Sequence, residues 1–418
     1  MTDKEKEKKE LSRRDFIRTA GIGGVSSLVA LSAGLTGNLF GADPTATATP
    51  TKTPARPEVP LRDFGKTGVK VPILALGGII DFTANLLLLK KAYDWGITYW
   101  DTANSYNGGQ SEEGIGQFFE KFPEARKKIF LVTKGGSRDP KGLDRMLNLS
   151  LERMKTDHID LFFLHGVRNA SDFTDEIKAW AEKVKKEGKI RFMGFSTHSN
   201  MAKLLQEAPK VGWIEGIMTT YNYRLMHDDE MKKGVDACQK AGIGLTAMKT
   251  QGGGAVKTDS EEELKLAGRF VKNGYTPEQA KIKAVWEDER MDSLCSQMNN
   301  LTTLTSNIAA AVDKTKLEMS DRGALKVYAK NTCSGYCAGC ADICENAVSG
   351  DVRIADVMRY MMYYNFYGET ERAKQEFAQL PSSMRRNLGR LDYTAAERAC
   401  PNNIPISKIM AEAEKTLA

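Results

Sequence analysis

Short apolar runs alternate with amphipathic stretches through the middle of the chain, from about residue 61 to residue 315. The runs are rich in β-branched residues and have the length of buried strands, whereas stretches such as 85–95 and 228–241 place apolar residues at helical spacing. Gly96, Gly188 and Gly242 end three of the helical stretches, where a left-handed turn favours glycine. Strands are predicted at 71–76, 97–101, 129–134, 159–165, 190–196, 214–221, 243–248 and 291–296.

Eight repeats of a strand followed by a helix within about 250 residues indicate an α/β fold, a (β/α)8 TIM barrel. We assign this barrel to residues 61–315. In such barrels the chemistry lies at the carboxyl ends of the strands. The polar residues expected at those ends are Asp101, Lys134, His165, Ser196 and Tyr221, with Tyr106 in the loop after the second strand.

The first 42 residues read as an export signal. A charged start carries Arg13-Arg14 with Phe16 close behind, and a weakly apolar, Gly- and Ser-rich stretch follows from about residue 19 to residue 42. This arrangement resembles the twin-arginine signal, which carries folded proteins to the periplasm or the outer face of the cytoplasmic membrane. A chance Arg-Arg pair before an uncleaved membrane helix is the alternative.

Residues 43–60 are rich in Thr, Pro and Ala and predict a semi-rigid linker. Beyond the signal no apolar run reaches about 18 residues, so no membrane span is expected in the mature protein. The net charge of +6 is small for 418 residues, and no basic run is interleaved with aromatic residues. Nucleic acid is therefore excluded as an expected partner.

Several segments of the predicted barrel resemble the aldo-keto reductase family. WDTANSYNGGQSEEGIG carries the family's Asp and Tyr, FLVTKG its Lys and DLFFLHGV its His. IRFMGFSTH and TTYN resemble the next two strands, so that the resemblance covers about residues 61–310. It implies an oxidoreductase that interconverts a small carbonyl and an alcohol. Taken one at a time, each of these residues also has a structural alternative, such as a salt bridge or a buried core histidine.

The family resemblance implies a role for each catalytic residue. Tyr106 is expected to donate the proton that the carbonyl oxygen needs, and to act as the base when an alcohol is oxidised. Lys134 is expected to lower the pKa of Tyr106, with Asp101 holding the lysine. His165 is expected to orient the carbonyl oxygen. Ser196 and Tyr221 are expected on the nicotinamide side of the pocket.

The nicotinamide side departs from the family pattern. Thr197 stands where the family usually has Asn, and Met218 stands where it usually has Gln. Residues 295–300 contain no Arg that could clamp a 2′-phosphate. The NAD(P)(H)-binding motif is therefore eroded, and NAD, NADP and no exchangeable nicotinamide all stay open.

Four cysteines, Cys333, Cys337, Cys340 and Cys344, form a C-x3-C-x2-C-x3-C group near the C-terminus. Its last two gaps match those of ferredoxin-type sites, in which thiolates hold a [4Fe–4S] cluster. Cys400, directly before Pro401, is an alternative ligand, because it resembles the end of a second ferredoxin motif. A zinc site, disulfides and a radical-SAM triad are the weaker alternatives.

Residues 325–418 are therefore predicted to form a small, mostly helical, metal-binding domain, a ferredoxin-like iron–sulfur extension. Some twin-arginine-exported aldo-keto reductases are similar in carrying such an extension. Two interpretations of the whole chain follow. In the first, an exported enzyme passes electrons from its substrate through one [4Fe–4S] cluster to a redox partner. In the second, a non-catalytic aldo-keto reductase scaffold serves as an electron-transfer or partner-binding module.

Overall fold

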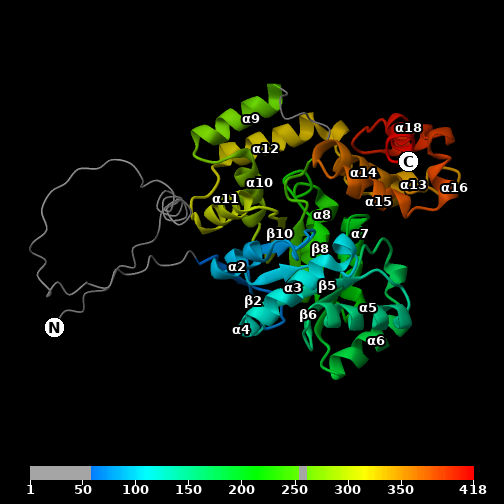
Figure 1. The fold of residues 1–418 in the computed structure, drawn as a ribbon. Coiled ribbons are helices and arrows are strands. Elements are labelled where there is room, and N and C mark those ends of the chain that lie inside the picture. The colour runs from blue at the N-terminus through cyan, green and yellow to red at the C-terminus, as the bar shows by residue number, and fades with distance from the viewer. Residues whose placement is uncertain (1–57, 254–260) are drawn as a thin grey trace, which may run out of the picture.

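The computed structural model describes residues 58–253 and 261–418 (Figure 1). The predicted signal, residues 1–42, and all but the last three residues of the predicted linker lie outside the described residues and stay predictions. Within the described ranges, no helix has the length and apolar character needed to cross a membrane.

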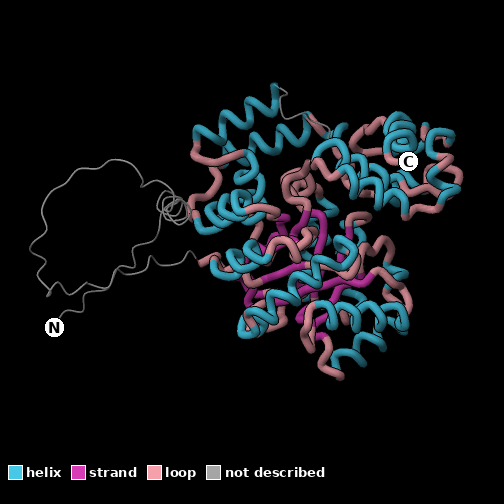
Figure 2. The backbone as a smooth tube through the Cα atoms, viewed as in Figure 1, coloured by secondary structure: helices cyan, strands magenta, loops and turns pink. Residues whose placement is uncertain are grey.

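Eight parallel strands close into a barrel in the order β10-β3-β4-β5-β6-β7-β8-β9, which confirms the predicted barrel. Figure 2 shows these strands at the centre, with helices around them. The strands are β3 (Leu74–Gly77), β4 (Tyr99–Asp101), β5 (Phe130–Gly135), β6 (Ile159–Leu164), β7 (Ile190–Thr197), β8 (Gly216–Thr220), β9 (Gly244–Met248) and β10 (Ser293–Gln297).

The first predicted strand, 71–76, is two strands in the structure. β2 (Lys70–Pro72) pairs antiparallel with β1 (Leu61–Asp63), and β3 then enters the barrel. Phe64, in the turn between β1 and β2, is fully buried among the side chains of the barrel interior. This hairpin therefore closes the amino end of the barrel and leaves the carboxyl end for the site.

Alternation along each strand separates two cores. In β6, Leu161 and Phe163 point into the barrel, while Phe162 and Leu164 pack against the surrounding helices. The helices are α2 (Leu86–Asp94), α3 (Gln110–Lys121), α4 (Pro123–Arg126), α5 (Pro140–Arg153), α6 (Asp175–Lys186), α7 (Met201–Val211), α8 (Asp229–Ala241), α9 (Glu261–Lys272), α10 (Pro277–Trp286) and α11 (Leu301–Val312), with the 3-10 turns η1 (Tyr106–Gly109) and η2 (Ala170–Asp172).

Local signals set several helix ends. The Asp139 carboxylate accepts a hydrogen bond from the Gly142 N–H at 2.8 Å and begins α5, and Asp228 caps α8 through the Met231 N–H. Gly242 ends α8 with a φ of 79°, as the sequence predicted.

A helical unit follows the barrel and has a core of its own, built around Val357, Phe377 and Met410. The predicted domain start at residue 325 falls inside α12 (Met319–Asn331), whose buried Leu325 and Tyr328 pack with α9 and α10 and not with this core. The remaining elements are η3 (Cys333–Gly335), α13 (Ala341–Glu345), α14 (Ile354–Phe366), α15 (Thr370–Ala378), α16 (Ser382–Arg385), η4 (Leu388–Arg390), α17 (Thr394–Ala399) and α18 (Ile406–Thr416).

Polar contacts fix the helical unit beside the carboxyl end of the barrel (Figure 1). Arg168, after β6, forms ion pairs of 2.5 Å with both Glu345 and Asp356. Asn200, before α7, donates from its backbone N–H to the Gly339 carbonyl at 2.6 Å and from its side chain to Asp342 at 2.8 Å. The unit therefore meets the barrel through the cysteine-bearing segment itself.

Candidate active site and cysteine pocket

Lys134 and Asp101 form a buried ion pair at the carboxyl ends of β5 and β4. The Lys134 ammonium donates to both Asp101 oxygens, at 2.6 and 2.7 Å, and to the Thr102 carbonyl at 2.7 Å. Burial opposes the charge on Lys134, but the Asp101 carboxylate outweighs burial and raises the pKa of the ammonium. Lys134 is therefore a fixed cation whose three donors are all occupied.

Tyr106 lies next to this cation, at the start of η1. The Lys134 Nζ is 4.9 Å from the centre of the Tyr106 ring. Burial raises the pKa of Tyr106 to about 12, and the nearby Lys134 charge opposes this rise. The expected direction of the lysine effect is thus present, but burial outweighs it. Tyr106 keeps its proton at neutral pH and can donate it.

His165 completes the group at the end of β6. Its ring centre is 5.7 Å from that of Tyr106, with the planes at 78°. Burial, and next the Lys134 charge, lower the pKa of His165 well below its usual value, so that the imidazole is neutral. A neutral imidazole can donate one hydrogen bond to a carbonyl oxygen. The structure therefore brings together all four residues expected to be catalytic.

The two residues expected on the nicotinamide side behave differently. The Ser196 hydroxyl accepts a hydrogen bond from the Gly166 N–H at 3.1 Å and so supports the loop after His165. Tyr221 is fully buried between the sheet and the outer helices, and its hydroxyl donates to Asp288 at 2.6 Å. The Tyr221 hydroxyl is thus occupied by Asp288, and the contact of Tyr221 with a nicotinamide stays a prediction.

Among the described residues, the segment 295–300, where the phosphate clamp was expected, contains no Lys or Arg. Asn300 caps α11 itself, since its side chain accepts from the Thr303 N–H at 2.8 Å. An open polar hollow beside β10 is lined by Asp81, Asn107, Gln297 and Asn299 among others, and no Lys or Arg is among its lining residues. These residues do not fit the 2′-phosphate of NADP, because a dianion there would face a carboxylate without a counter-charge.

Comparison with known sequences shows the protein family to which the barrel belongs. The sequence model described as "Aldo/keto reductase family" matches residues 75–320, more than half of the chain. The chain belongs to the aldo-keto reductase family. The prediction of an oxidoreductase of this kind is thereby confirmed, and members of the family generally use NAD(P)(H).

This aldo-keto reductase is a distant relative of the proteins that it resembles. It is 27% identical to the uncharacterized oxidoreductase YrpG of Bacillus subtilis over 265 residues, 56% of this chain and 78% of YrpG. It is 31% identical to the L-glyceraldehyde 3-phosphate reductase of Escherichia coli K12 over 214 residues, 44% of this chain and 60% of that enzyme.

Among solved structures, the holo form of aldo-keto reductase AKR11C1 from Bacillus halodurans matches with a TM-score of 0.54 and 21% identity, over 65% of this chain and 96% of that one. The thermostable aldo-keto reductase Tm1743 matches with a TM-score of 0.53 and 25% identity, over 64% and 99%. The family match ends at residue 320, before the cysteine segment.

The helical unit of this aldo-keto reductase adds charges at the barrel mouth that the sequence did not reveal. Tyr363 of α14 is fully buried beneath Lys249, whose Nζ lies 4.2 Å from its ring centre. The Arg372 guanidinium lies at the same distance from that ring, and Arg359 donates to the Tyr363 hydroxyl at 3.2 Å. Burial raises the pKa of Tyr363, but these three cations together outweigh it and lower the pKa to about 8.

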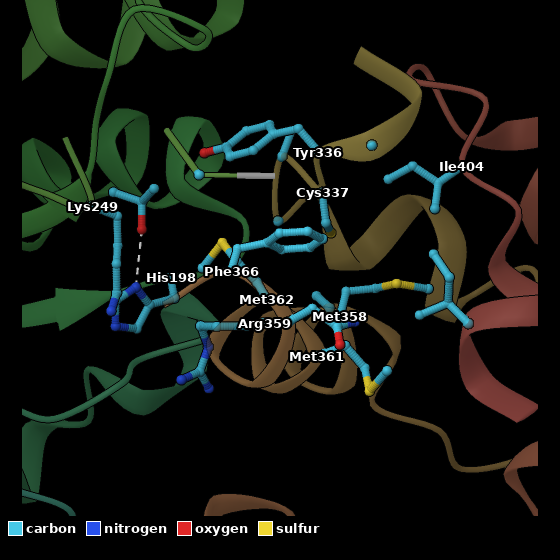
Figure 3. A pocket seen from close by; sticks show the side chains of 18 of the residues that line it. His198, Lys249, Tyr336, Cys337, Met358, Arg359, Met361, Met362, Phe366 and Ile404 are labelled. Carbon is cyan, nitrogen blue, oxygen red and sulfur yellow. Dashed lines mark hydrogen bonds between the residues drawn. The ribbon is translucent and has the colours of Figure 1, made fainter. Parts of the chain in front are cut away.

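A cavity of about 270 Å³ lies between the barrel mouth and the helical unit (Figure 3). His198, Thr220 and Lys249 line it from the barrel, and Arg359 and several methionines line it from α14. The His198 Nδ1 is 2.9 Å from the Thr220 hydroxyl, the contact drawn as a dashed line in Figure 3. Thr220, and not the neighbouring Tyr221, is thus the residue of β8 that faces this cavity.

A second, narrow cavity gathers four cysteines. Cys337, Cys340, Cys344 and Cys400 all line it, with Pro401 beside them. Cys333 does not line it and lies in η3, one turn before the segment that docks on the barrel. The chain after α17 returns Cys400 to this cavity, so that Cys400 lies where the sequence allowed either Cys333 or Cys400, and the choice between the two stays a prediction.

These thiols influence one another electrostatically. Burial raises the pKa of Cys337 well above its usual value and that of Cys344 to about 12, and the neighbouring cysteines raise both further. Across the described part of the chain, no three His, Cys, Asp or Glu side chains are grouped closely enough to hold a single metal ion. The four cysteines thus surround a pocket and do not converge on a point.

Proposed function

We propose that this aldo-keto reductase is an exported enzyme that interconverts a carbonyl and an alcohol and passes electrons through one [4Fe–4S] cluster. The cluster ligands in this proposal are Cys337, Cys340, Cys344 and Cys400. Cys333, which the sequence pattern favoured, is left out because it lies outside the cysteine cavity.

The barrel supports the proton chemistry. A carbonyl oxygen placed between Tyr106 and His165 would accept hydrogen bonds from the phenol and from the neutral imidazole. Tyr106 would then give its proton to that oxygen as charge develops on it, and the fixed Lys134 cation would stabilise the tyrosinate left behind. In the reverse direction the same tyrosinate would take the proton of an alcohol. The carbonyl carbon must receive a hydride from a bound two-electron carrier, which the cluster would re-reduce one electron at a time, and the residues of the site leave the identity of this carrier open.

The cysteine cavity supports a cluster over a single zinc ion. Burial raises the pKa values of Cys337, Cys340 and Cys344, so these thiols need a strong positive charge beside them before they can all be thiolates. Their spacing, C-x2-C-x3-C and then a distant C-P, combines the last gaps of a ferredoxin motif with the Cys-Pro pair of a second one. A cubane holds its thiolates at separate corners, which suits ligands that surround a pocket. When bound, a [4Fe–4S] cluster passes electrons one at a time.

One observation carries the link between the two sites: Cys337 lines both cavities. The cavity that reaches Lys249 and His198 at the barrel mouth therefore ends at a proposed cluster ligand. A cofactor there would lie between the barrel mouth and the cluster. Electrons would leave the cluster toward an external redox partner, which fits a protein delivered by a twin-arginine signal already folded around its cofactor.

The test is anaerobic purification of the full chain, followed by visible and EPR spectra, iron and sulfide analysis, and mass spectrometry of released cofactors. About four irons and four sulfides per chain are expected for one cubane. A panel of alcohols and carbonyls should then bleach or restore the cluster absorbance. A colourless protein that holds only zinc would refute the cluster, and an intact cluster that no panel member changes would refute the proposed reaction.

A further inference from the structure

The cavity between the barrel and α14 combines an apolar wall with two positively charged side chains. Its wall includes Met358, Met361, Met362, Ile404 and Ile409, side chains that offer no strong hydrogen bond. Its barrel end holds Lys249 and Arg359 (Figure 3). At about 270 Å³ the cavity has the size of a small-ligand site.

Lys249 is the clearest sign that a ligand charge is missing. Among the residues that the structure describes, no carboxylate lies within ion-pair distance of its ammonium, which instead hydrogen-bonds Tyr363 and lies 4.2 and 5.5 Å from the ring centres of Tyr363 and Tyr367. Burial lowers its pKa. Its backbone has a φ of 56°, a strained conformation for a residue other than glycine, of the kind found most often at functional sites.

Arg359 has an unused donor at the same place. Its guanidinium donates to the Asp356 carboxylate at 3.1 Å and to the Tyr363 hydroxyl at 3.2 Å. Its Nε, however, is buried and has no hydrogen-bond partner among the described residues. A buried donor without a partner costs about 1–3 kcal/mol, and a bound acceptor would remove that cost.

Two neighbouring arginines already form ion pairs with carboxylates of the protein. Arg372 pairs with Glu369 at 2.7 Å and with Glu376 at 3.6 Å. Arg168 pairs with Glu345 and Asp356. His198 is neutral, because burial and then the charges of Arg359 and Lys249 lower its pKa. Lys249, which has no carboxylate partner among the described residues, and the unpartnered Nε of Arg359 thus lie at the same end of the cavity.

We propose that this cavity binds a monocarboxylate with an apolar body, its carboxylate between Lys249 and Arg359 and its body along the methionine wall. The inference goes beyond the proposed function and does not rest on it, because the four residues with catalytic roles are not among those that line this cavity. The binding itself requires neither the cluster nor turnover.

Calorimetric titration of the anaerobic full-length protein with octanoate, and with octanamide as its uncharged match, tests the proposal. Octanoate should bind roughly 10- to 100-fold more tightly than octanamide, as expected for hydrogen bonds to a charged acceptor. Equal affinities, or no binding of octanoate, would overturn it. This comparison uses only the unaltered protein, so misfolding of a variant cannot obscure it.

Two variants of Lys249 test whether this residue binds the carboxylate of octanoate. Lys249→Met should lose most of the preference for octanoate, and Lys249→Arg should restore part of it. Lys374→Met is the matched control, since Lys374 is exposed on α15 of the same helical unit and is not among the residues that line the cavity, and the affinity of this variant for octanoate should stay within about twofold. An unchanged preference in Lys249→Met would refute the assignment. Charge-selective binding without any turnover would instead refute the proposed function and leave this inference standing.

Discussion

The Lys134 ammonium bonds both oxygens of the Asp101 carboxylate inside the barrel, at 2.6 and 2.7 Å. This pair joins the ends of two adjacent strands and keeps a positive charge 4.9 Å from the ring centre of Tyr106. The same contact therefore has two consequences, one for the proton that Tyr106 donates and one for the stability of the barrel, and the two can be measured separately.

Tyr106→Phe should lower the turnover of any active alcohol or carbonyl by about 10²- to 10⁴-fold, the usual contribution of a positioned proton donor. The fold should be unaffected, because no hydrogen bond of the Tyr106 hydroxyl occurs within the described residues. Steady-state kinetics and thermal unfolding of the variant check both statements.

Tyr99→Phe is the converse control. The Tyr99 hydroxyl lies 3.0 Å from that of Thr246, buried in the barrel interior. Its removal should cost about 1 kcal/mol of stability and leave turnover within a few-fold. A Tyr106→Phe protein with unchanged turnover would show that the barrel does not use this phenol.

Lys134→Met should destabilise the barrel by about 3–5 kcal/mol, because Asp101 would be left as an uncompensated buried charge. The double variant Asp101→Asn, Lys134→Met removes both charges and should recover most of that loss. Urea unfolding at pH 7 measures the two differences. A double variant no more stable than Lys134→Met would mean that the pair contributes through packing and not through charge.

The barrel was predictable because strand and helix signals are local. Alternation in β6 already separates Leu161 and Phe163 from Phe162 and Leu164, and the register then closes the sheet. The surroundings of Tyr221 could not be predicted in the same detail. One position along a strand end reverses the side of the sheet that a residue faces, so that Thr220 meets the cavity while Tyr221 bonds Asp288, 67 residues later.

The rest of the site depends on contacts between distant segments. The spacing of cysteines in the sequence does not predict that Cys400 lies near Cys337. Helices α14 to α17 separate the two in the chain, and only their packing brings the two together. The charges around Tyr363 were missed for the same reason. Lys249 comes from the barrel, whereas Arg359 and Arg372 come from two helices of the other unit, and in the sequence each is an ordinary charged residue.

Two variants test whether Cys400 or Cys333 is a cluster ligand. Cys400→Ser should lose most of its iron or convert the cluster to a smaller form with altered EPR, because a thiolate ligand is removed from the cavity. Cys333→Ser should retain iron, sulfide and spectrum. Iron analysis after anaerobic purification compares them directly, and the reverse result would return Cys333 to the ligand set.

Tyr363 should titrate near pH 8. Its ionised form is favoured in the folded protein by Lys249, Arg359 and Arg372, which outweigh the effect of burial. Since the folded pKa lies below the unfolded value of about 10, this group adds stability that is present above pH 10 and is lost as the pH falls through 8.

Ultraviolet difference spectra of the protein against its Tyr363→Phe variant should show tyrosinate absorbance rising with a midpoint near pH 8. In a Lys249→Met background the midpoint should move upward, because one of the three cations is gone. A difference spectrum with a midpoint near 10 in both backgrounds would show that the cations do not act on this phenol.

Gly339 tests the docking of the cysteine segment on the barrel. It lies between Cys337 and Cys340 with a φ of 74°, and a Cβ there would lie 2.4 Å from the His198 carbonyl oxygen. Gly368 has a similar φ of 66°, but nothing lies within 4 Å of the Cβ that a side chain would add. Both glycine-to-alanine changes therefore introduce the same backbone strain, and only Gly339→Ala adds a collision with backbone.

Gly368→Ala should cost about 1 kcal/mol or slightly more. Gly339→Ala should cost clearly more and should separate the helical unit from the barrel, because the hydrogen bond from Asn200 to the Gly339 carbonyl cannot keep its length of 2.6 Å. Hydrogen exchange of residues 198–203 and 337–345, together with the unfolding free energies, measures the difference. Equal losses in the two variants would show that the close approach of Gly339 to His198 does not hold the units together.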